Sequence, residues 1–407
     1  RLITGNHPRH LEGWQPMSAH VVHADCLAAL RDMPDASVDA VVTDPPYGLS
    51  NTTPAQVSET ITRWVSGDRE YLPSARGFMG HEWDGFVPPV AVWDECLRVL
   101  KPGGHLLAFA GSRTHDLMTL GIRLAGFGIR DSIAWLHAQG FPKAKSQLKP
   151  AFEPVTLARK PLTGTVAANV LEYGTGALNI DATRIQYASE SDRDQTRVPQ
   201  PVQHNDAHAV YQMGTGQGRN GETFTPAPAG RWPANVVLDE SQAAELDRQS
   251  GNVKTGATKP HRRDPDSSPM FKVGKWMTHS QPASEGGASR FFKVIEHDAP
   301  FMYCAKAPKS ERPVVDGVAH STVKPVTLMK WLVRMVTPPG GTVLDPFAGS
   351  GTTLEAAMLE GFNVIGVERE ADYLPLIQAR IERATAELEA RAEAEGDTLF
   401  PIDGSAS

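Results

Sequence analysis

The chain has 407 residues, of which 40% are hydrophobic and 21% charged, with a formal net charge of −7. This length suffices for one large α/β domain plus a smaller one, and the composition is that of a soluble globular protein without a membrane-spanning run. Cys26, Cys96 and Cys304 lie far apart without metal-ligand spacing. The sequence therefore predicts no disulfide bonds, no zinc or other metal site, and a reducing, cytoplasmic location.

The first part of the chain alternates short apolar runs with helical patterns. Residues 1–16 lack a secretory-signal pattern, and Met17 begins the stretch that runs into strand-like sequence. We therefore expect residues 1–16 to be a leader or added segment. From 17 to 160 we expect the first part of an α/β domain. Its clearest elements are buried strands at 37–44 and 103–110 and helices at 91–100 and 115–127.

A second part, 313–395, shows the same alternation. We expect helices at 324–336 and 350–362, strands at 342–347 and 363–368, and a charged helix at 372–395. Strands that alternate with helices at this spacing are typical of parallel strands with crossover helices. The predicted fold class is therefore α/β, with a Rossmann-like, doubly wound and mostly parallel sheet.

The stretch between them, 161–312, is rich in Gly, Pro, Ser, Gln and Asn. It contains only short strand-like pieces, at 234–240 and 290–296, and no long periodic helix. We therefore expect an irregular inserted domain here, and a frayed tail at 396–407. Its basic side chains form a cluster that is either a solvated loop or a site for phosphate contacts: Lys254, Lys259, His261, Arg262, Arg263, Lys272 and Lys275.

The sharpest local signal is Asp44-Pro45-Pro46-Tyr47, which follows the apolar run 38–42. Consecutive prolines fix φ and remove two donors, so the Asp44 carboxylate and the Pro45 carbonyl become a rigid pair of acceptors. Such a pair fits an NH₂ group, whose lone pair can then attack an electrophilic methyl group. Tyr47 offers a flat face for an extruded base. The alternative is a proline turn that ends a strand and carries a stray acid.

The second signal follows the predicted strand at 342–347 and opens a predicted helix. Its residues are Asp345, Pro346, Phe347, Ala348, Gly349, Ser350, Gly351 and Thr352. A glycine-rich bend between strand and helix lets the backbone approach a ligand, and the next strand ends in Glu368, which suits ribose hydroxyls. The lysine of a P-loop is missing, so a nucleotide triphosphate is not expected. A nucleoside-containing cofactor is favoured over a structural turn.

With both motifs in this order, the chain resembles the β-class amino-methyltransferases of DNA, in which a D-P-P-Y segment precedes the F-x-G-x-G cofactor segment. The target recognition region lies between them, which corresponds to 161–312 here. The resemblance implies a catalytic methyltransferase domain at 17–160 and a cofactor-binding part at 313–395. It also implies S-adenosyl-L-methionine as the cofactor.

Further segments extend the resemblance. The family's acidic segment matches 23–30, which implies that Asp25 contacts the cofactor adenine. The stretch 321–325 resembles H-P-T-x-K-P, which implies that Thr322 and Lys324 lie near the methionine end of the cofactor, although Ser321 stands where proline is usual. Segments at 77–85, 140–144 and 174–185 resemble phage and prophage methyltransferases, without an assigned chemistry.

The resemblance implies base flipping and direct methyl transfer to an exocyclic amino group. Asp44 in the first motif position favours N6 of adenine over N4 of cytosine, which stays the alternative. A cytosine-C5 enzyme would need a Pro-Cys nucleophile pair, and the sequence has none. A catalytically silent DNA-binding protein and a methyltransferase for RNA or protein are weaker alternatives.

DNA is the expected partner, and no membrane partner is expected. A homodimer and a cognate restriction endonuclease, as part of a restriction-modification system, are further candidate partners. Several residues of the middle region could contact DNA or build a small core, and for the aromatic ones we expect a core position. These residues are Trp232, Trp276, Arg290, Phe291 and Phe292.

Overall fold

A computed structural model of the chain describes residues 2–4, 18–75, 77, 84–137, 148, 151–186, 230–251, 253–255, 284–286, 293–295, 311–315, 317–320 and 322–398. Contacts divide the chain into two compact units, one made of Arg1–Ala182 and Ile295–Ser407 and the other of Thr183–Val294. The division differs from the expected boundaries at 161 and 312, which stay predictions, because the helix α5 (Val166–Tyr173) packs on the first unit.

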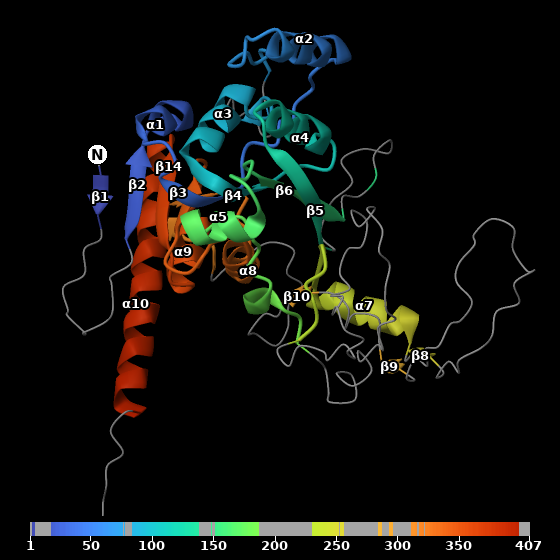
Figure 1. The fold of residues 1–407 in the computed structure, drawn as a ribbon, viewed down its shortest axis with the longest axis vertical. Helices are drawn as coiled ribbons and strands as arrows, with labels where there is room; N and C mark the ends of the chain where they lie inside the picture. Colours follow the sequence, from blue (N-terminus) through green and yellow to red (C-terminus); the bar gives the residue numbers. More distant parts are fainter. Residues whose placement is uncertain are drawn as a thin grey trace, which may run out of the picture. The chain divides into compact units, whose positions relative to one another are not determined.

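The first unit is built on one twisted sheet with the strand order β1-β2-β14-β13-β3-β4-β6-β5 (Figure 1). Neighbouring strands from β2 through β14, β13 and β3 to β4 are parallel, and β6 is antiparallel to both β4 and β5. The strands are β1 (Leu2–Thr4), β2 (Ala19–His23), β3 (Val38–Thr43), β4 (Leu100–Phe109), β5 (Gly128–Leu136), β6 (Phe152–Arg159), β13 (Thr342–Asp345) and β14 (Asn363–Glu368).

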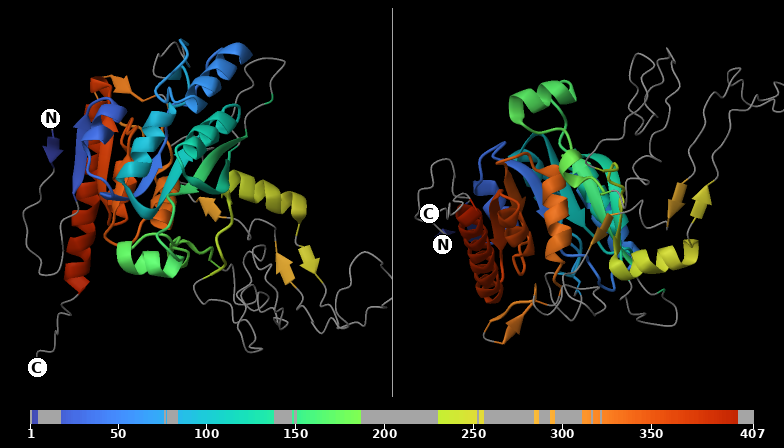
Figure 2. Two further views of the ribbon diagram at one scale, coloured as in Figure 1. Left: turned by 45° about the horizontal axis from the view of Figure 1, so that its top comes forward. Right: turned by 90° about the horizontal axis from the view of Figure 1, so that it is seen from below.

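Helices cover both faces of this sheet (Figure 2). One group, whose members pack on each other, consists of α1 (Cys26–Asp32), α3 (Val90–Val99) and α4 (His115–Leu124). The other consists of α8 (Val326–Val336), α9 (Thr352–Leu359) and α10 (Leu374–Thr398). Because both faces are covered, the central strands are mostly apolar, and every residue of β3 is buried. The fold class predicted from the sequence is confirmed.

The order of the strands reverses between β13 and β3, which are direct neighbours with Val343 opposite Ala40. From β13 the chain passes through α9 to β14 on one side, and from β3 it passes through α3 to β4 on the other. Such a reversal opens a crevice at the carboxyl ends of the two strands, where open α/β sheets bind ligands. Both sequence motifs lie at this reversal.

The long periodic elements predicted from the sequence are confirmed: α3, α4, α8, α9, α10, β3, β4, β13 and β14 overlap the predicted ranges. Other elements were not predicted, among them α2 (Pro54–Val65), β6 and α5. Residues 2–4, within the segment expected to be a leader, pair with β2 as an antiparallel edge strand.

In the second unit, β7 (Val236–Asp239) leads into α7 (Glu240–Ser250), and β8 (Val253–Thr255) pairs with β9 (Ser284–Gly286). The 11-residue helix α7 was not expected in this region. Trp232 is 61% exposed, with the Arg184 guanidinium 5.7 Å from its ring centroid. The expected core position is therefore wrong for Trp232. The remaining four candidates and most of the basic cluster lie outside the described residues; Lys254 lies in β8.

No helix within the described parts of the chain is both long and apolar enough to cross a membrane. Over the same residues, no group of three or more His, Cys, Asp and Glu side chains is arranged to hold a metal ion. Cys26 and Cys96 are free thiols, and burial raises the pKa of Cys26 to about 12. Cys304 lies outside the described residues.

Candidate active site

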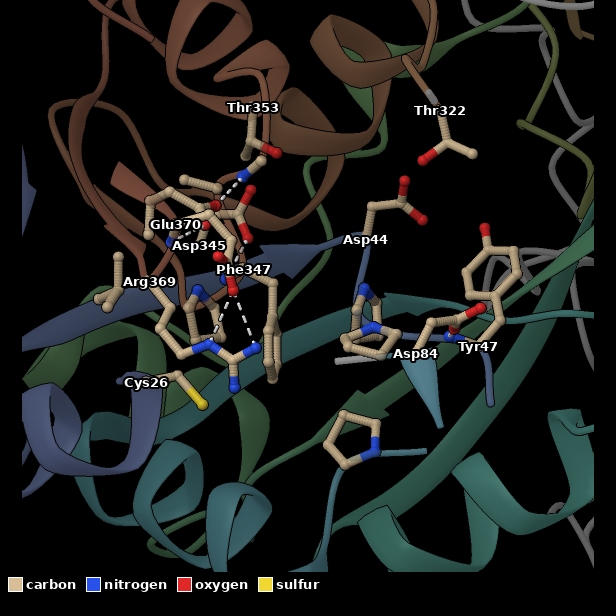
Figure 3. A pocket seen from close by; sticks show the side chains of 18 of the residues that line it. Cys26, Asp44, Tyr47, Asp84, Thr322, Asp345, Phe347, Thr353, Arg369 and Glu370 are labelled. Atoms are coloured by element: carbon tan, nitrogen blue, oxygen red, sulfur yellow. Dashed lines mark hydrogen bonds and ion pairs between the residues drawn. The ribbon is translucent and has the colours of Figure 1, made fainter. Parts of the chain in front are cut away.

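A cavity of about 340 Å³ opens where β3 and β13 end. Figure 3 shows two groups of side chains around it: Asp44 and Tyr47 on one side, and Asp345, Phe347 and Arg369 on the other. The first group belongs to the loop after β3 and the second to the end of β13 and the turns after β13 and β14. Residues about 300 positions apart in the sequence thus share one cavity because their strands are neighbours.

Most of the residues singled out in the sequence line this cavity. They are Asp25, Asp44, Pro45, Pro46, Tyr47, Thr322, Lys324, Asp345, Pro346, Phe347, Ala348, Gly349, Ser350, Thr352 and Glu368. Gly351 is not among the lining residues; it directly precedes α9 with φ of 83°. The structure brings the two motifs together, while the chemical role of each residue stays a prediction.

The loop after β3 is held by a buried carboxylate that the sequence did not single out. Asp84 Oδ1 accepts hydrogen bonds from the backbone N–H groups of Tyr47, at 2.8 Å, and Gly48, at 3.0 Å. Thr114 Oγ1 donates to the Tyr47 carbonyl at 2.6 Å. Gly48 has φ of 64°, and a Cβ there would lie 2.7 Å from the Val87 nitrogen, so the chain needs glycine. The loop is therefore rigid.

The two oxygens of the Asp44 carboxylate have different surroundings. Oδ2 accepts a hydrogen bond from Lys324 Nζ at 2.5 Å. Oδ1 is buried and has no hydrogen-bond partner among the described residues. Since leaving a charged oxygen buried and unpaired costs free energy, Oδ1 is suited to accept a hydrogen from a ligand.

Lys324 connects Asp44 to the start of β6. Its Nζ lies 3.4 Å from Glu153 Oε2, which also accepts a hydrogen bond from the Tyr47 hydroxyl at 2.9 Å. Burial lowers the pKa of Lys324, but the carboxylates of Asp44 and Glu153 outweigh it and raise the pKa above its usual value. The pKa of Tyr47 is raised, by burial first and then by the same two carboxylates. Lys324 is thus a buried ammonium and Tyr47 a neutral phenol.

The turn after β13 is shaped by its backbone. Asp345 Oδ1 accepts hydrogen bonds from Thr43 Oγ1 at 2.7 Å and from the Phe347 N–H at 3.0 Å. Burial raises the pKa of Asp345 to about 6. Gly349 has φ of 53°, and a Cβ there would lie 3.2 Å from His320 Nε2. Because glycine has no side chain at this position, the backbone of the turn stays open to the cavity.

Glu368, at the end of β14, is oriented by two backbone donors. Its Oε2 accepts from the Gly349 N–H and its Oε1 from the Glu370 N–H, each at 2.7 Å. Burial raises the pKa of Glu368. Asp25 begins α1, and its Oδ1 accepts from the N–H groups of Leu27 and Ala28. Glu368 and Asp25 still have oxygen lone pairs for a ligand.

His320 and Thr322 precede α8 at the rim of the cavity. The His320 ring lies 4.6 Å from the ring of Tyr373, edge to face, and its Nδ1 interacts with the Thr322 backbone. Burial lowers the pKa of His320, so its imidazole is neutral at pH 7. Thr322 is exposed, and Ser321 lies outside the described residues.

Sequence reasoning missed several lining residues, above all Asp84, Glu153, His320 and Tyr373. Asp84 lies within the segment 77–85, whose resemblance to methyltransferases implies no chemistry for it. Glu153 stands alone before an apolar run and gives no local signal. Only the pairing of β6 with β4 and β5 brings it to the cavity.

Comparison with known families agrees with this geometry. The family model for DNA methylases of the N6/N4 type matches residues 38–379, and the chain belongs to this family. The match includes both motifs and the region between them. The resemblance to β-class amino-methyltransferases is thereby confirmed, whereas the likeness to phage enzymes stays a prediction.

Individual relatives match over shorter stretches. The chain is 43% identical over 63 residues to the type II methyltransferase M.BglI of Bacillus subtilis, covering 16% of this chain and 18% of that protein. The same identity and coverage hold for the type II methyltransferase M.HinfI of Haemophilus influenzae. The chain thus spans less than a fifth of these relatives. Among solved structures, the PvuII DNA methyltransferase (cytosine-N4-specific) is 14% identical, with 90% of each chain covered and a TM-score of 0.43.

Proposed function

We propose that this protein transfers a methyl group from S-adenosyl-L-methionine to the exocyclic amino group of a base in DNA, namely N6 of adenine. The observation that carries the proposal is the Oδ1 of Asp44, which is buried in the cavity and has no hydrogen-bond partner among the described residues. An acceptor held in this way accepts one hydrogen of an NH₂ group, and the neighbouring Pro45 carbonyl is suited to the other. An amine held by both hydrogens turns its lone pair toward a methyl donor.

The cavity also fits the cofactor. Glu368 presents an oriented carboxylate suited to ribose hydroxyls, and Gly349 removes the side chain that would fill the turn. When bound, the cofactor supplies a methyl group on a positively charged sulfur. Asp25, Phe347 and Glu368 line the cavity and are proposed to hold the nucleoside part. The acidic lining favours a cationic ligand.

The substrate base has to leave the DNA duplex, since its amino group is paired inside the double helix. Tyr47 lines the cavity next to Asp44, and its hydroxyl is fixed by Glu153, so the ring offers a pre-oriented face for stacking. Arg184 and the exposed Trp232 of the second unit are proposed DNA contacts. The cytoplasmic location, a homodimer and a cognate restriction endonuclease stay predictions.

Cytosine-N4 methylation is the second candidate. It poses the same chemical problem, since the exocyclic amine of cytosine also offers two hydrogens to the acceptors at Asp44 and Pro45. Asp44 in the first motif position favours adenine by resemblance alone. A catalytically silent DNA-binding protein is disfavoured, because it would have no use for the unpartnered Oδ1.

The test is to incubate the protein with DNA of varied sequence and methyl-labelled S-adenosyl-L-methionine, digest the DNA and identify the labelled nucleoside by mass spectrometry. We expect N6-methyladenine from the wild type and no label from Asp44→Ala. Asp116→Ala, which removes an exposed aspartate at the start of α4, serves as the matched control and retains activity. Labelled N4-methylcytosine would show that the target base is cytosine and not adenine. Cofactor binding without DNA label would refute it.

A further inference from the structure

Lys324 lies just before α8, on the stretch that leads from the middle region back into the sheet unit. Its side chain is only 7% exposed. The resemblance to H-P-T-x-K-P placed this lysine at the methionine end of the cofactor. That expectation stays a prediction, and the contacts of Lys324 within the protein add a second role.

The contacts of the ammonium among the described residues come from the base side of the cavity. Nζ donates to Asp44 Oδ2 at 2.5 Å and lies 3.4 Å from Glu153 Oε2. It lies 5.2 Å from the ring centroid of Tyr47 and 4.9 Å from that of Phe109. These partners belong to the β3 loop, β4 and β6, and none belongs to the turn after β13.

The arrangement has a direct consequence for Asp44. A buried ammonium that bonds Oδ2 fixes the rotation of the carboxylate, because rotation would break a short charge-assisted hydrogen bond in a low-dielectric environment. Oδ1 is then the oxygen left to accept a substrate hydrogen. The same ammonium attracts the face of the Tyr47 ring, whose hydroxyl is fixed by Glu153.

We infer that Lys324 is a positioning residue of the catalytic loop, which holds Asp44 and Tyr47 in the geometry that receives the base amine. The inference rests on the proposed function and deepens it. It assigns the lysine of this motif to the substrate side of the site, where it acts through Asp44 and does not touch the reacting atoms.

Lys324→Met is the direct test, because methionine retains the apolar stem without the charge. A misplacement of about 1 Å costs on the order of 100-fold in rate. We expect kcat to fall by about that factor while the dissociation constant for S-adenosyl-L-methionine, measured by calorimetry, changes less than about twofold. Lys324→Arg, which keeps the charge, should recover part of the lost rate.

The matched control is Lys101→Met. Lys101 Nζ pairs with Asp39 Oδ1 at 2.6 Å, so this variant removes a comparable ion pair from the other end of β3, outside the cavity. It should keep kcat near the wild-type value.

Amide hydrogen exchange gives a readout that does not depend on activity. In Lys324→Met we expect faster exchange at Tyr47 and Gly48 and unchanged exchange at Gly349 and Gly351. A tenfold loss of cofactor affinity with an unchanged kcat would overturn the inference, as would wild-type exchange in the β3 loop. A wild-type protein that methylates no DNA would instead refute the proposed function, and the exchange result would still decide whether Lys324 holds the loop.

Discussion

The two loops of the cavity achieve rigidity in opposite ways. The loop after β3 contains two prolines and is held by Asp84, Thr114 and Lys324, so it presents a side-chain carboxylate in a fixed orientation. The turn after β13 contains two glycines with positive φ and is held by the carboxylates of Asp345 and Glu368. This turn presents its backbone to the cavity, where the first loop presents a side chain.

This difference corresponds to two tasks. A reacting amine needs acceptors at fixed positions, which a stiff loop with a held carboxylate supplies. A large cofactor needs room close to the backbone, which glycines supply. We therefore expect substitutions in the first loop to lower the rate of methyl transfer, and substitutions in the second to weaken cofactor binding.

The largest stability effect is expected where the two loops meet, at Asp345, whose carboxylate accepts from Thr43 of the neighbouring strand. Burial raises its pKa from 3.8 to about 6. A raised acid pKa stabilises the folded protein below about pH 4, and this contribution is lost as the pH rises through about 6. Asp345→Asn should therefore be more stable than the wild type by up to about 3 kcal/mol at pH 8, and similar to it at pH 4.

Denaturant unfolding of the cofactor-free protein at the two pH values measures this difference. Asn keeps an oxygen that accepts from Thr43 and Phe347, so these two hydrogen bonds are retained. Equal stability differences at pH 4 and pH 8 would show that the buried carboxylate is not the cause.

Tyr47→Ala should come next. Stacking of a base on an aromatic ring contributes about 1–3 kcal/mol, so its loss should lower kcat/KM for DNA by about 10- to 100-fold. Tyr47→Phe, which removes only the hydroxyl bonded to Glu153, should cost much less. Steady-state kinetics with both variants separates the ring from the hydroxyl. Equal losses would mean that the hydrogen bond, not stacking, is what the site needs.

A smaller effect is expected for Gly349→Ala in the cofactor turn. Alanine at φ of 53° costs about 1–2 kcal/mol, and its Cβ would lie 3.2 Å from His320 Nε2. Calorimetry should show about tenfold weaker binding of S-adenosyl-L-methionine, with the rate at saturating cofactor nearly unchanged. A lower rate of methyl transfer at saturating cofactor would contradict the proposal that the second turn serves only cofactor binding.

The smallest effect is expected at Asp25, which both caps α1 and lines the cavity. Asp25→Ala should lower the free energy of unfolding by about 1 kcal/mol, whereas Asp25→Ser should keep the cap. If Asp25 also contacts the cofactor, both variants bind it more weakly. If Asp25→Ser binds S-adenosyl-L-methionine with wild-type affinity, Asp25 only caps α1 and does not contact the cofactor.

The sequence predicted those parts of the site that are local in the chain. The run 38–42 is apolar except for Asp39 because β3 is buried on both faces, so the position of Asp44 at a strand end could be inferred directly. The glycines of the second turn and Glu368 were found for the same reason, since strand, turn, helix and strand follow one another without interruption.

Residues that reach the site through tertiary contacts could not be predicted. The segment around Asp84 does not reveal its role and Glu153 carries no local signal, because both roles depend on Tyr47 and Lys324, which are distant in sequence. The antiparallel insertion of β6 between β4 and β5 was equally hidden. A residue's neighbours across a sheet depend on strand order, which a single strand's pattern does not encode.

The most direct test of the account is single-turnover methyl transfer by Asp44→Asn at saturating S-adenosyl-L-methionine, with the cofactor dissociation constant measured in parallel. Asn keeps the shape of the side chain but replaces one acceptor oxygen with a donor and removes the charge that pairs with Lys324. The account predicts a rate lowered by about 100- to 1,000-fold with wild-type cofactor affinity. A wild-type rate, or a loss that lies entirely in cofactor affinity, would contradict it.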